Sequence, residues 1–543
     1  MLPFVIETPL LRRWGVHLGL LLLMGWYAWA TLPYLDRYPR LEAAQMGIVA
    51  PAHKLATEGI YGNELYAGYY GMETHNYEYM PLYPLLVALS FKGFGLGIWQ
   101  ARMVSVLCGL VILLLTYCLG RQLYDNVVSL LAVFVLCVVQ LGLDSSLYHS
   151  GILLLDLARV IRYDVLVPVW VLAACLLFLR SFQRQSRLGY VGTGVLAGLA
   201  TLSHLYGGFI LAVFGSVLLW QHGWRALRRV PLYLILAGWV LALVPWLLYI
   251  LQDVVAYQGQ LLRHPGRFEV FNPLFYGENL IREVHRYRPW IGPTLHTPVL
   301  WPRLGIWVAV IGIPAAMLIL WKKARRQRGV SDQMAFIALP VLALLLAALV
   351  SFKRYPYLAL LLPFLALQLA FVFAHLWRGA GQQKRHVRYA LALLVMALTL
   401  EGGLSLAKHT QKAHQATPYQ QLTDALRTAV PDDARVLLSQ TYWLTLNENE
   451  TPSIVLPFLL SDPQYYPLAP RPMEEIIAAI DPDYIVVEKY FLEDYVHDPR
   501  TAANPWACAK WAQFGAYTRR ACPTLVTAVS TPDYGEIRVY RCE

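Results

Sequence analysis

The chain has 543 residues, of which 57% are apolar and only 15% are charged. Globular proteins carry about 25% charged residues, so much of this chain must avoid water, and a disordered, fibrous or disulfide-stapled secreted protein is excluded. The formal net charge of +11 does not indicate nucleic-acid binding, because the basic residues lie in short loops between long apolar runs. The composition therefore predicts an integral membrane protein that has no nucleic acid among its partners.

The apolar runs predict a polytopic α-helical membrane protein with about eleven transmembrane helices. The run at 80–98 is interrupted by prolines and glycines and is expected not to cross. With this assignment the loops rich in Lys and Arg face the cytoplasm, so the N-terminus is predicted inside and the C-terminus outside the plasma (inner) membrane. The expected spans are 14–32, 101–120, 126–143, 162–180, 189–203, 206–220, 231–251, 303–321, 334–351, 355–375 and 388–405.

The predicted membrane module covers residues 1–405 and carries three outer loops, at 34–100, 144–161 and 252–302. Beyond the last span, residues 406–543 become more polar and are expected to form a small extracytoplasmic α/β domain. The strands of this domain are predicted at 433–440 and 481–490, with a helix at 472–480 between them.

Three cysteines lie in the predicted outer domain, where disulfides can form. One disulfide is expected, with one thiol left over, and the pairing of Cys508 with Cys522 is preferred over pairings with Cys542. The other four cysteines lie in apolar runs and are expected to behave as small apolar side chains.

Glu42 stands a few residues beyond the first span and begins a helical stretch that Gly59 ends. A carboxylate at a helix N-terminus interacts favourably with the helix dipole, which is the structural interpretation of this residue. The functional interpretation makes Glu42 a general base at a site that faces the outer leaflet. The residue pattern leaves both interpretations open.

Arg162 and Asp164 lie where the fourth span begins. They form either a structural ion pair at the membrane boundary or a site in which Asp164 binds a divalent cation or a sugar hydroxyl while the Arg holds a phosphate. Carboxylate oxygens of this kind suit Mg²⁺ or Mn²⁺. His204 lies in the turn between the fifth and sixth spans, where a structural and a functional role are both open.

Lys353 and Arg354 lie on the predicted outer side, against the positive-inside bias. An anionic partner such as a lipid phosphate explains them, and so does snorkelling to lipid headgroups. In the loop 252–302, basic residues that include Arg267 and Arg286 alternate with aromatic ones. This mixture is typical of an interfacial belt or of a groove for a phosphorylated lipid and a stacked sugar.

Several short motifs follow one another along residues 10–405, namely a long outer loop that starts with an acidic residue, MPLYP at 80–84, LGRQLY at 119–124, RYD at 162–164 and FKRY at 352–355. In this order they resemble the GT-C glycosyltransferases, and within these the group of the protein O-mannosyltransferases and the lipid A aminoarabinose transferases. The resemblance implies transfer of a sugar from a polyprenyl-phosphate donor to a glycan, lipid or protein acceptor at the outer face. It also implies inversion at the anomeric carbon.

The resemblance further implies roles for individual residues. Glu42 is then the general base and Asp164 the second acid, although relatives carry an Asp-Glu pair where this chain has Leu41 before Glu42. The residues expected to bind the donor phosphate are Arg162, His204, Lys353 and Arg354. The residues expected to contact substrate are Tyr83, Arg267, Arg286 and Tyr355.

Two other functions compete with glycosyl transfer. A non-catalytic membrane scaffold or subunit would keep the fold and the lipid groove, and Leu41 favours it. A transporter or lipid flippase predicts ionisable residues near the bilayer midplane and inverted repeats, which the sequence does not show.

Overall fold

The computed structural model describes residues 9–142, 150–263, 269–287, 303–327, 329–380, 385–498, 501 and 504–543. The chain divides into two compact units, which are treated separately. Unit 1 comprises Met1–Pro33, Ser105–Leu247 and Gly266–Gln411. Unit 2 comprises Tyr34–Val104, Leu248–Pro265 and Lys412–Glu543. The boundary predicted at residue 405 between a membrane module and an outer domain stays a prediction.

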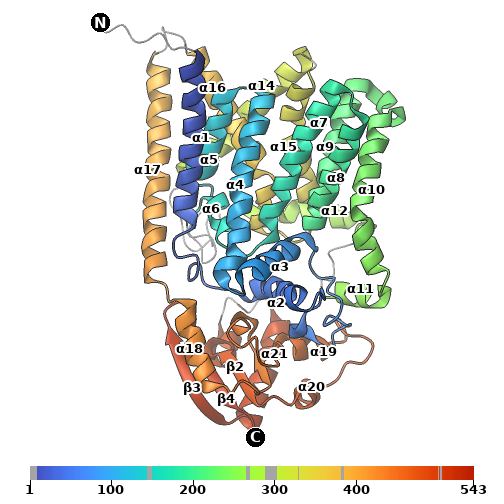
Figure 1. Ribbon diagram of the computed structural model, residues 1–543, viewed down its shortest axis with the longest axis vertical. Coiled ribbons are helices and arrows are strands. Elements are labelled where there is room, and N and C mark those ends of the chain that lie inside the picture. The colour runs from blue at the N-terminus through green and yellow to red at the C-terminus, as the bar shows by residue number, and fades with distance from the viewer. Residues whose placement is uncertain are drawn as a thin grey trace. The chain divides into compact units, whose positions relative to one another are not determined.

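Unit 1 is built from long apolar helices that run roughly parallel to one another (Figure 1). Neighbouring pairs include α7 with α8, α5 with α16, and α9 with α15. Wholly or for most of their length, its helices are α1 (Pro9–Thr31), α4 (Ile98–Leu123), α5 (Asn126–Val138), α6 (Leu153–Ala158), α7 (Leu166–Arg184), α8 (Arg187–Ser203), α9 (Ile210–His222), α10 (Val230–Ile250), α12 (Pro273–Arg282), α14 (Leu304–Gln327), α15 (Val330–Leu349), α16 (Leu362–Gly379) and α17 (Arg385–Gln415).

Small residues set the close packing of α8 against α10. A Cβ atom added at Gly194 would overlap the backbone carbonyl of Ile235, and one added at Gly238 would overlap that of Val191. Without hydrophobic driving force between helices in lipid, such close backbone approach is a main source of helix association. Substituting either glycine would therefore force the two helices apart.

Eight helices in the described part of the chain are long and apolar enough to cross a membrane, judged by length and composition. They correspond to eight of the eleven expected spans, beginning with α4 and ending with α17. The other three expected spans coincide with α1, α5 and α8, of which α5 is shorter than expected because its helix ends at Val138. The segment 80–98 contains the 13-residue helix α3. The count of eleven and the orientation of the termini stay predictions.

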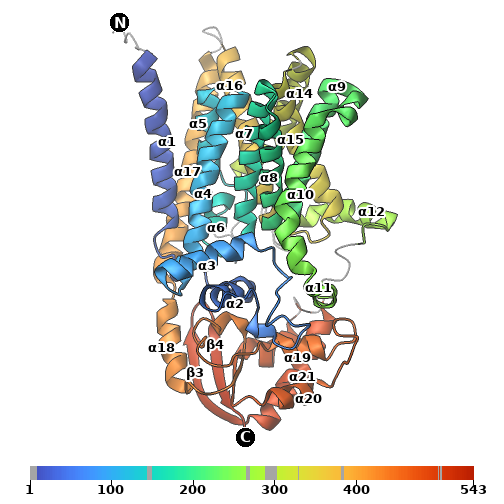
Figure 2. The same ribbon diagram turned by 45° about the vertical axis from the view of Figure 1, so that its right-hand side comes forward.

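Unit 2 combines helices with a four-stranded sheet whose strand order is β1-β2-β4-β3. Strands β3 and β4 of this sheet lie side by side (Figure 2). The first two strands are parallel and the other two pairs are antiparallel. The parallel pair requires a crossover, which contains α20. The elements are α2 (Ala43–Thr57), α3 (Leu82–Phe94), α11 (Val254–Leu261), α18 (Tyr419–Ala429), β1 (Val436–Leu438), α19 (Val455–Leu460), α20 (Met473–Ile480), β2 (Tyr484–Glu488), α21 (Pro505–Ala521), β3 (Thr524–Thr531) and β4 (Gly535–Arg541).

The local predictions in this unit are confirmed where the pattern was strong. Strands β1 and β2 lie inside the ranges 433–440 and 481–490, and α20 fills 472–480 apart from its first residue. The core between sheet and helices contains Leu437, Ile485, Ile477 and Phe514, all fully buried. Burial of these apolar side chains is the main term that holds the sheet to its helices.

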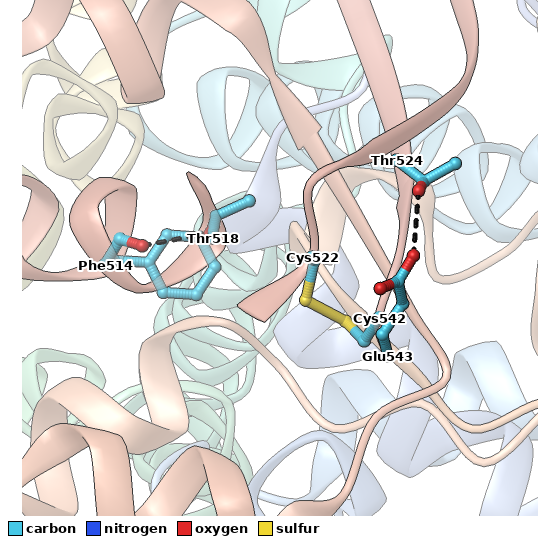
Figure 3. Close-up of a disulfide and its surroundings, with 6 residues drawn as sticks. All are labelled: Phe514, Thr518, Cys522, Thr524, Cys542 and Glu543. Carbon is cyan, nitrogen blue, oxygen red and sulfur yellow. Dashed lines mark hydrogen bonds between the residues drawn. A yellow bond between two sulfur atoms is a disulfide. The ribbon is translucent and has the colours of Figure 1, made fainter. Parts of the chain in front are cut away.

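The predicted disulfide between Cys508 and Cys522 is wrong, because Cys522 pairs with Cys542 (Figure 3). Cys508 lies in the first turn of α21 and Cys522 follows its last residue. Fourteen helical residues separate two Cα atoms by about 21 Å, whereas a disulfide needs about 7 Å or less. Cys542 comes close because β4 carries the chain back, and the Glu543 N–H then donates to the Ala521 carbonyl.

Candidate functional site

Asp164 lies in a short 3-10 turn, Tyr163–Val165, directly before α7. Its carboxylate is fully buried and accepts hydrogen bonds from the Arg162 guanidinium Nε at 2.7 Å and from the Tyr206 hydroxyl at 2.9 Å. The Arg162 side chain keeps 23% of its surface exposed. The ion pair of the structural interpretation is therefore present, and it is buried on the Asp164 side and partly exposed on the Arg162 side.

His204 is brought to the same place by the turn between α8 and α9. Its ring nitrogen accepts a hydrogen bond from the backbone N–H of Tyr206, which caps the turn Leu205–Phe209. The ring is stacked on Tyr163 at 5.1 Å and lies 5.2 Å from the ring of Tyr357, as measured between centroids. These contacts place His204 among the aromatic rings around the Arg162–Asp164 pair.

A second charged group joins residues of the segment before α16 to the 3-10 turn Glu283–Tyr287 that follows α12. The Glu283 carboxylate contacts the Lys353 Nζ at 2.9 Å and the Arg286 Nε at 2.6 Å. Arg286 is fully buried and also donates to the backbone carbonyls of Arg354 and Leu346, both at 3.2 Å. Glu283 was not among the residues predicted from the sequence.

The two charged groups belong to one network in unit 1. The Tyr206 hydroxyl binds Asp164, the rings of Tyr206 and Tyr357 lie 5.2 Å apart, and the Arg286 guanidinium carbon lies 5.7 Å from the Tyr357 ring centroid. Residues from four separate stretches of sequence thus meet. Of the predicted residues, those that the network includes are Arg162, Asp164, His204, Arg286 and Lys353.

The ammonium of Lys353 is held in partly dry surroundings, since only 5% of its side-chain surface is exposed. Burial lowers the pKa of Lys353 below its usual range, and the hydrogen bond and the charge of Glu283 oppose that shift. Burial likewise raises the pKa of the neighbouring Tyr287 hydroxyl. A cation that lacks full hydration attracts an anion more strongly than one in water.

An apolar cavity of about 350 Å³ lies in unit 1 next to this network. It shares chain segments with the network, since Tyr287 follows Arg286, Leu358 follows Tyr357, and the Leu141 carbonyl accepts a hydrogen bond from the Tyr355 hydroxyl. Volumes of this size are typical of small-molecule sites. Other lining residues are Leu153, Met317, Pro340, Leu361 and Leu365.

Two of the remaining predicted residues, Glu42 and Tyr83, belong to unit 2. Glu42 occupies the N-cap position of α2 in unit 2, is half-buried, and makes no capping hydrogen bond with its side chain. Tyr83 is fully buried in α3, also in unit 2. The Arg354 side chain is exposed and its guanidinium carbon lies 4.7 Å from the ring centroid of Phe352. Arg267 lies outside the described residues.

Comparisons with known proteins agree with this architecture. Residues 79–249, about a third of the chain, match the sequence model of a family described as dolichyl-phosphate-mannose-protein mannosyltransferase. A search of curated protein sequences gave no significant match. Among solved structures, ArnT from Cupriavidus metallidurans bound to undecaprenyl phosphate is 15% identical, with a TM-score of 0.58 and coverage of 97% of both chains.

The oligosaccharyltransferase AglB from Archaeoglobus fulgidus, in complex with an inhibitory peptide and a dolichol-phosphate, superimposes with a TM-score of 0.59 at 13% identity. The match covers 97% of this chain and 74% of AglB. The chain has the GT-C fold. The resemblance to GT-C proteins, first seen in the order of the sequence motifs, is confirmed by the family match and the shared fold.

A divalent cation was expected at Asp164, and one structure of the Archaeoglobus oligosaccharyltransferase is described as a complex with Zn and sulfate. In the part of this chain that the structure describes, no group of three His, Cys, Asp or Glu side chains could hold a metal ion. Both carboxylate oxygens of Asp164 already accept hydrogen bonds from Arg162 and Tyr206. The residues around Asp164 therefore do not fit a metal site by themselves, and metal dependence stays a prediction.

Proposed function

We propose that this chain is a membrane glycosyltransferase that moves a sugar from a polyprenyl-phosphate donor to an acceptor at the outer face, with inversion. The observation that carries the proposal is the network of Arg162, Asp164, Arg286 and Lys353 beside an apolar cavity in unit 1. Such a pairing suits a ligand with an anionic head and a hydrocarbon tail. The family match and the lipid phosphates in the related structures support the same donor class.

The proposed transfer reaction needs a general base for the acceptor and cations for the departing phosphate. An acceptor hydroxyl attacks the anomeric carbon of the donor, the bond from that carbon to the phosphate oxygen breaks, and polyprenyl phosphate leaves. The hydroxyl proton passes to the carboxylate of Glu42, the proposed general base. Lys353 and Arg162 stabilise the charge that develops on the phosphate, with Arg354 and His204 as further phosphate contacts.

The remaining proposed roles concern the substrates. Asp164 orients Arg162 and the acceptor, while Tyr83, Tyr355, Arg286 and Arg267 contact donor or acceptor. The acceptor belongs to the class of glycans, lipids or proteins. For Asp164 and Arg286 the support comes from their places in the charged network, and for the others from the sequence.

The proposed location is the plasma (inner) membrane, with the N-terminus in the cytoplasm and the C-terminal residues outside. Charge asymmetry between the loops supports this orientation. The Cys522–Cys542 disulfide supports it independently, because disulfides persist in oxidising compartments outside the cytoplasm.

A catalytically inactive scaffold is the second candidate, and one observation favours it. Leu41 stands where relatives carry an acid, and it is only 2% exposed, as expected of a buried apolar residue. A scaffold would retain lipid binding but would show no turnover.

Turnover of radiolabelled donors separates the two candidates. The purified chain in nanodiscs is mixed with a donor and an acceptor, and the release of polyprenyl phosphate is measured. The donors are undecaprenyl-phosphate and dolichyl-phosphate esters of hexoses and pentoses. The acceptors are envelope glycans, lipids or peptides. We expect Glu42→Gln to lower kcat by about 10²- to 10⁴-fold, since a general base contributes that much. Glu58→Gln is the matched control, because Glu58 is an exposed carboxylate at the other end of α2.

Wild-type turnover by Glu42→Gln would refute the assignment of the base. No turnover by the wild-type chain with any donor, combined with retained binding of undecaprenyl phosphate, would refute the enzyme and favour the scaffold.

A further inference from the structure

Glu283 is a carboxylate held between two cations. It contacts the Lys353 ammonium at 2.9 Å and two nitrogens of the Arg286 guanidinium at 2.6 and 3.2 Å. Only 15% of its side chain is exposed, and the two cations are 5% and 0% exposed. The nearby pair of Glu278 with Arg282 differs, because both its partners are about 60% exposed.

The position of Glu283 matters because it occupies the cations that an anionic ligand would use. Lys353 has three N–H donors, and Glu283 takes one of them while the Ala347 carbonyl takes another at 2.6 Å. Arg286 binds Glu283 in a forked arrangement, which is the geometry that guanidinium groups also use for phosphate. A buried cation pair needs a counter-ion, and Glu283 supplies one from within the chain.

The reaction changes the charge on the phosphate. The sugar donor is a phosphodiester with one negative charge, whereas the released polyprenyl phosphate is a monoester that carries about −1.5 to −2 at neutral pH. Coulomb repulsion from a nearby carboxylate grows in proportion to the charge of the ligand. Glu283 must therefore oppose the product more strongly than the donor.

We propose that Glu283 is an internal counter-ion that competes with phosphate for Lys353 and so promotes release of the polyprenyl phosphate product. The inference rests on the proposed function, since it requires a phosphate ligand at Lys353. It makes Glu283 a positioning residue, which acts through Lys353 and Arg286 and sets the balance between donor and product binding.

Product inhibition tests the inference. The inhibition constant of undecaprenyl phosphate and the KM for the donor are measured for the wild-type chain, Glu283→Gln and Glu278→Gln. We expect Glu283→Gln to lower the inhibition constant by about tenfold or more, to lower KM by a smaller factor, and to slow steady-state turnover. Glu278→Gln removes a carboxylate from the solvent-exposed pair on α12 and is expected to change neither constant.

If Glu283→Gln changes the inhibition constant and KM by the same factor, or changes neither, the inference is overturned. Turnover by the wild-type chain would still leave the proposed function standing. A wild-type chain that neither turns over nor binds undecaprenyl phosphate would instead overturn the proposed function, and the inference with it. These two failures are distinguishable because the first is seen only in the variant.

If Glu283→Gln does not fold alone, the inference can still be tested by measuring how much undecaprenyl phosphate raises the unfolding midpoint. Removing the counter-ion leaves buried cations that the lipid phosphate can neutralise, so the lipid is expected to raise the unfolding midpoint of the variant more than that of the wild type. A variant that folds only with the lipid present supports the inference. A variant that the lipid stabilises no more than the wild type overturns it.

Discussion

Replacing Asp164 with Asn separates a structural ion pair from a functional one. The substitution keeps the shape of the side chain but removes its charge, so Arg162 loses its 2.7 Å contact with an ionised oxygen and the Tyr206 hydroxyl loses a charged acceptor. A purely structural pair would affect only stability. A group that holds Arg162 against the donor phosphate would also affect the chemical step.

The loss of folding free energy expected for Asp164→Asn follows from the burial of the ion pair. Breaking a fully buried ion pair costs about 3–5 kcal/mol, and the lower value applies here because Arg162 is 23% exposed and can be hydrated. Folding free energies are about 5–15 kcal/mol. Even at the low end, a loss of about 3 kcal/mol leaves about 2 kcal/mol, which keeps folded chains in roughly thirtyfold excess. A decrease in kcat of about 10²-fold or more could therefore not arise from unfolding.

The assay combines thermal unfolding with turnover of the labelled donor at a temperature well below the unfolding midpoint. Asp332→Asn is the matched control, because it breaks a comparable pair with Lys323 at 2.8 Å that lies outside the network. We expect both variants to lose stability and only Asp164→Asn to lose turnover. Full turnover by Asp164→Asn, with a lowered midpoint, would refute a functional role and leave the structural ion pair.

Two further predictions concern stability. Burial raises the pKa of Asp156 to about 7, above about 4 in the unfolded chain. The folded state therefore binds this proton more tightly, and the stability of the fold should fall as the pH rises from about 4 to 7. Asp156→Asn should flatten that decline in unfolding midpoints measured at pH 5 and 8, and an unchanged slope would contradict the assignment. The disulfide Cys522–Cys542 closes a loop of about twenty residues, so the double Ser variant should lose about 3 kcal/mol of folding free energy. Reductant should lower the unfolding midpoint of the wild type but not that of the variant.

Sequence patterns predicted the elements whose cause is local. The strands around Leu437 and Ile485 and the helix between them follow from runs of apolar residues bounded by turn residues. The disulfide could not be predicted in this way, because Cys542 meets Cys522 only after β4 has paired with its neighbours. Pairing of distant segments is a property of the fold and has no signature in the spacing of cysteines.

In the candidate site too, contacts between residues close in sequence could be predicted, whereas contacts between distant segments could not. The neighbours Arg162 and Asp164 could be recognised as a pair from their spacing, and the structure shows the bond between them. Glu283 was missed because its partner Lys353 lies seventy residues further along the chain. The three-residue spacing of Glu283 and Arg286 on one helical face was the available signal, but it does not distinguish an exposed pair from a buried one.

The charged network of unit 1 carries a net positive charge. Three cationic side chains, Arg162, Arg286 and Lys353, meet two carboxylates, Asp164 and Glu283, so these five formally charged groups sum to +1. Within these five groups, which leave out the exposed Arg354 side chain, a net charge of +1 matches a phosphodiester donor, which carries one negative charge, better than a phosphomonoester, which carries nearly two. The network is therefore balanced for the donor and undercharged for the product, so a chain with both carboxylates intact should bind the substrate without becoming trapped by the lipid phosphate that it releases.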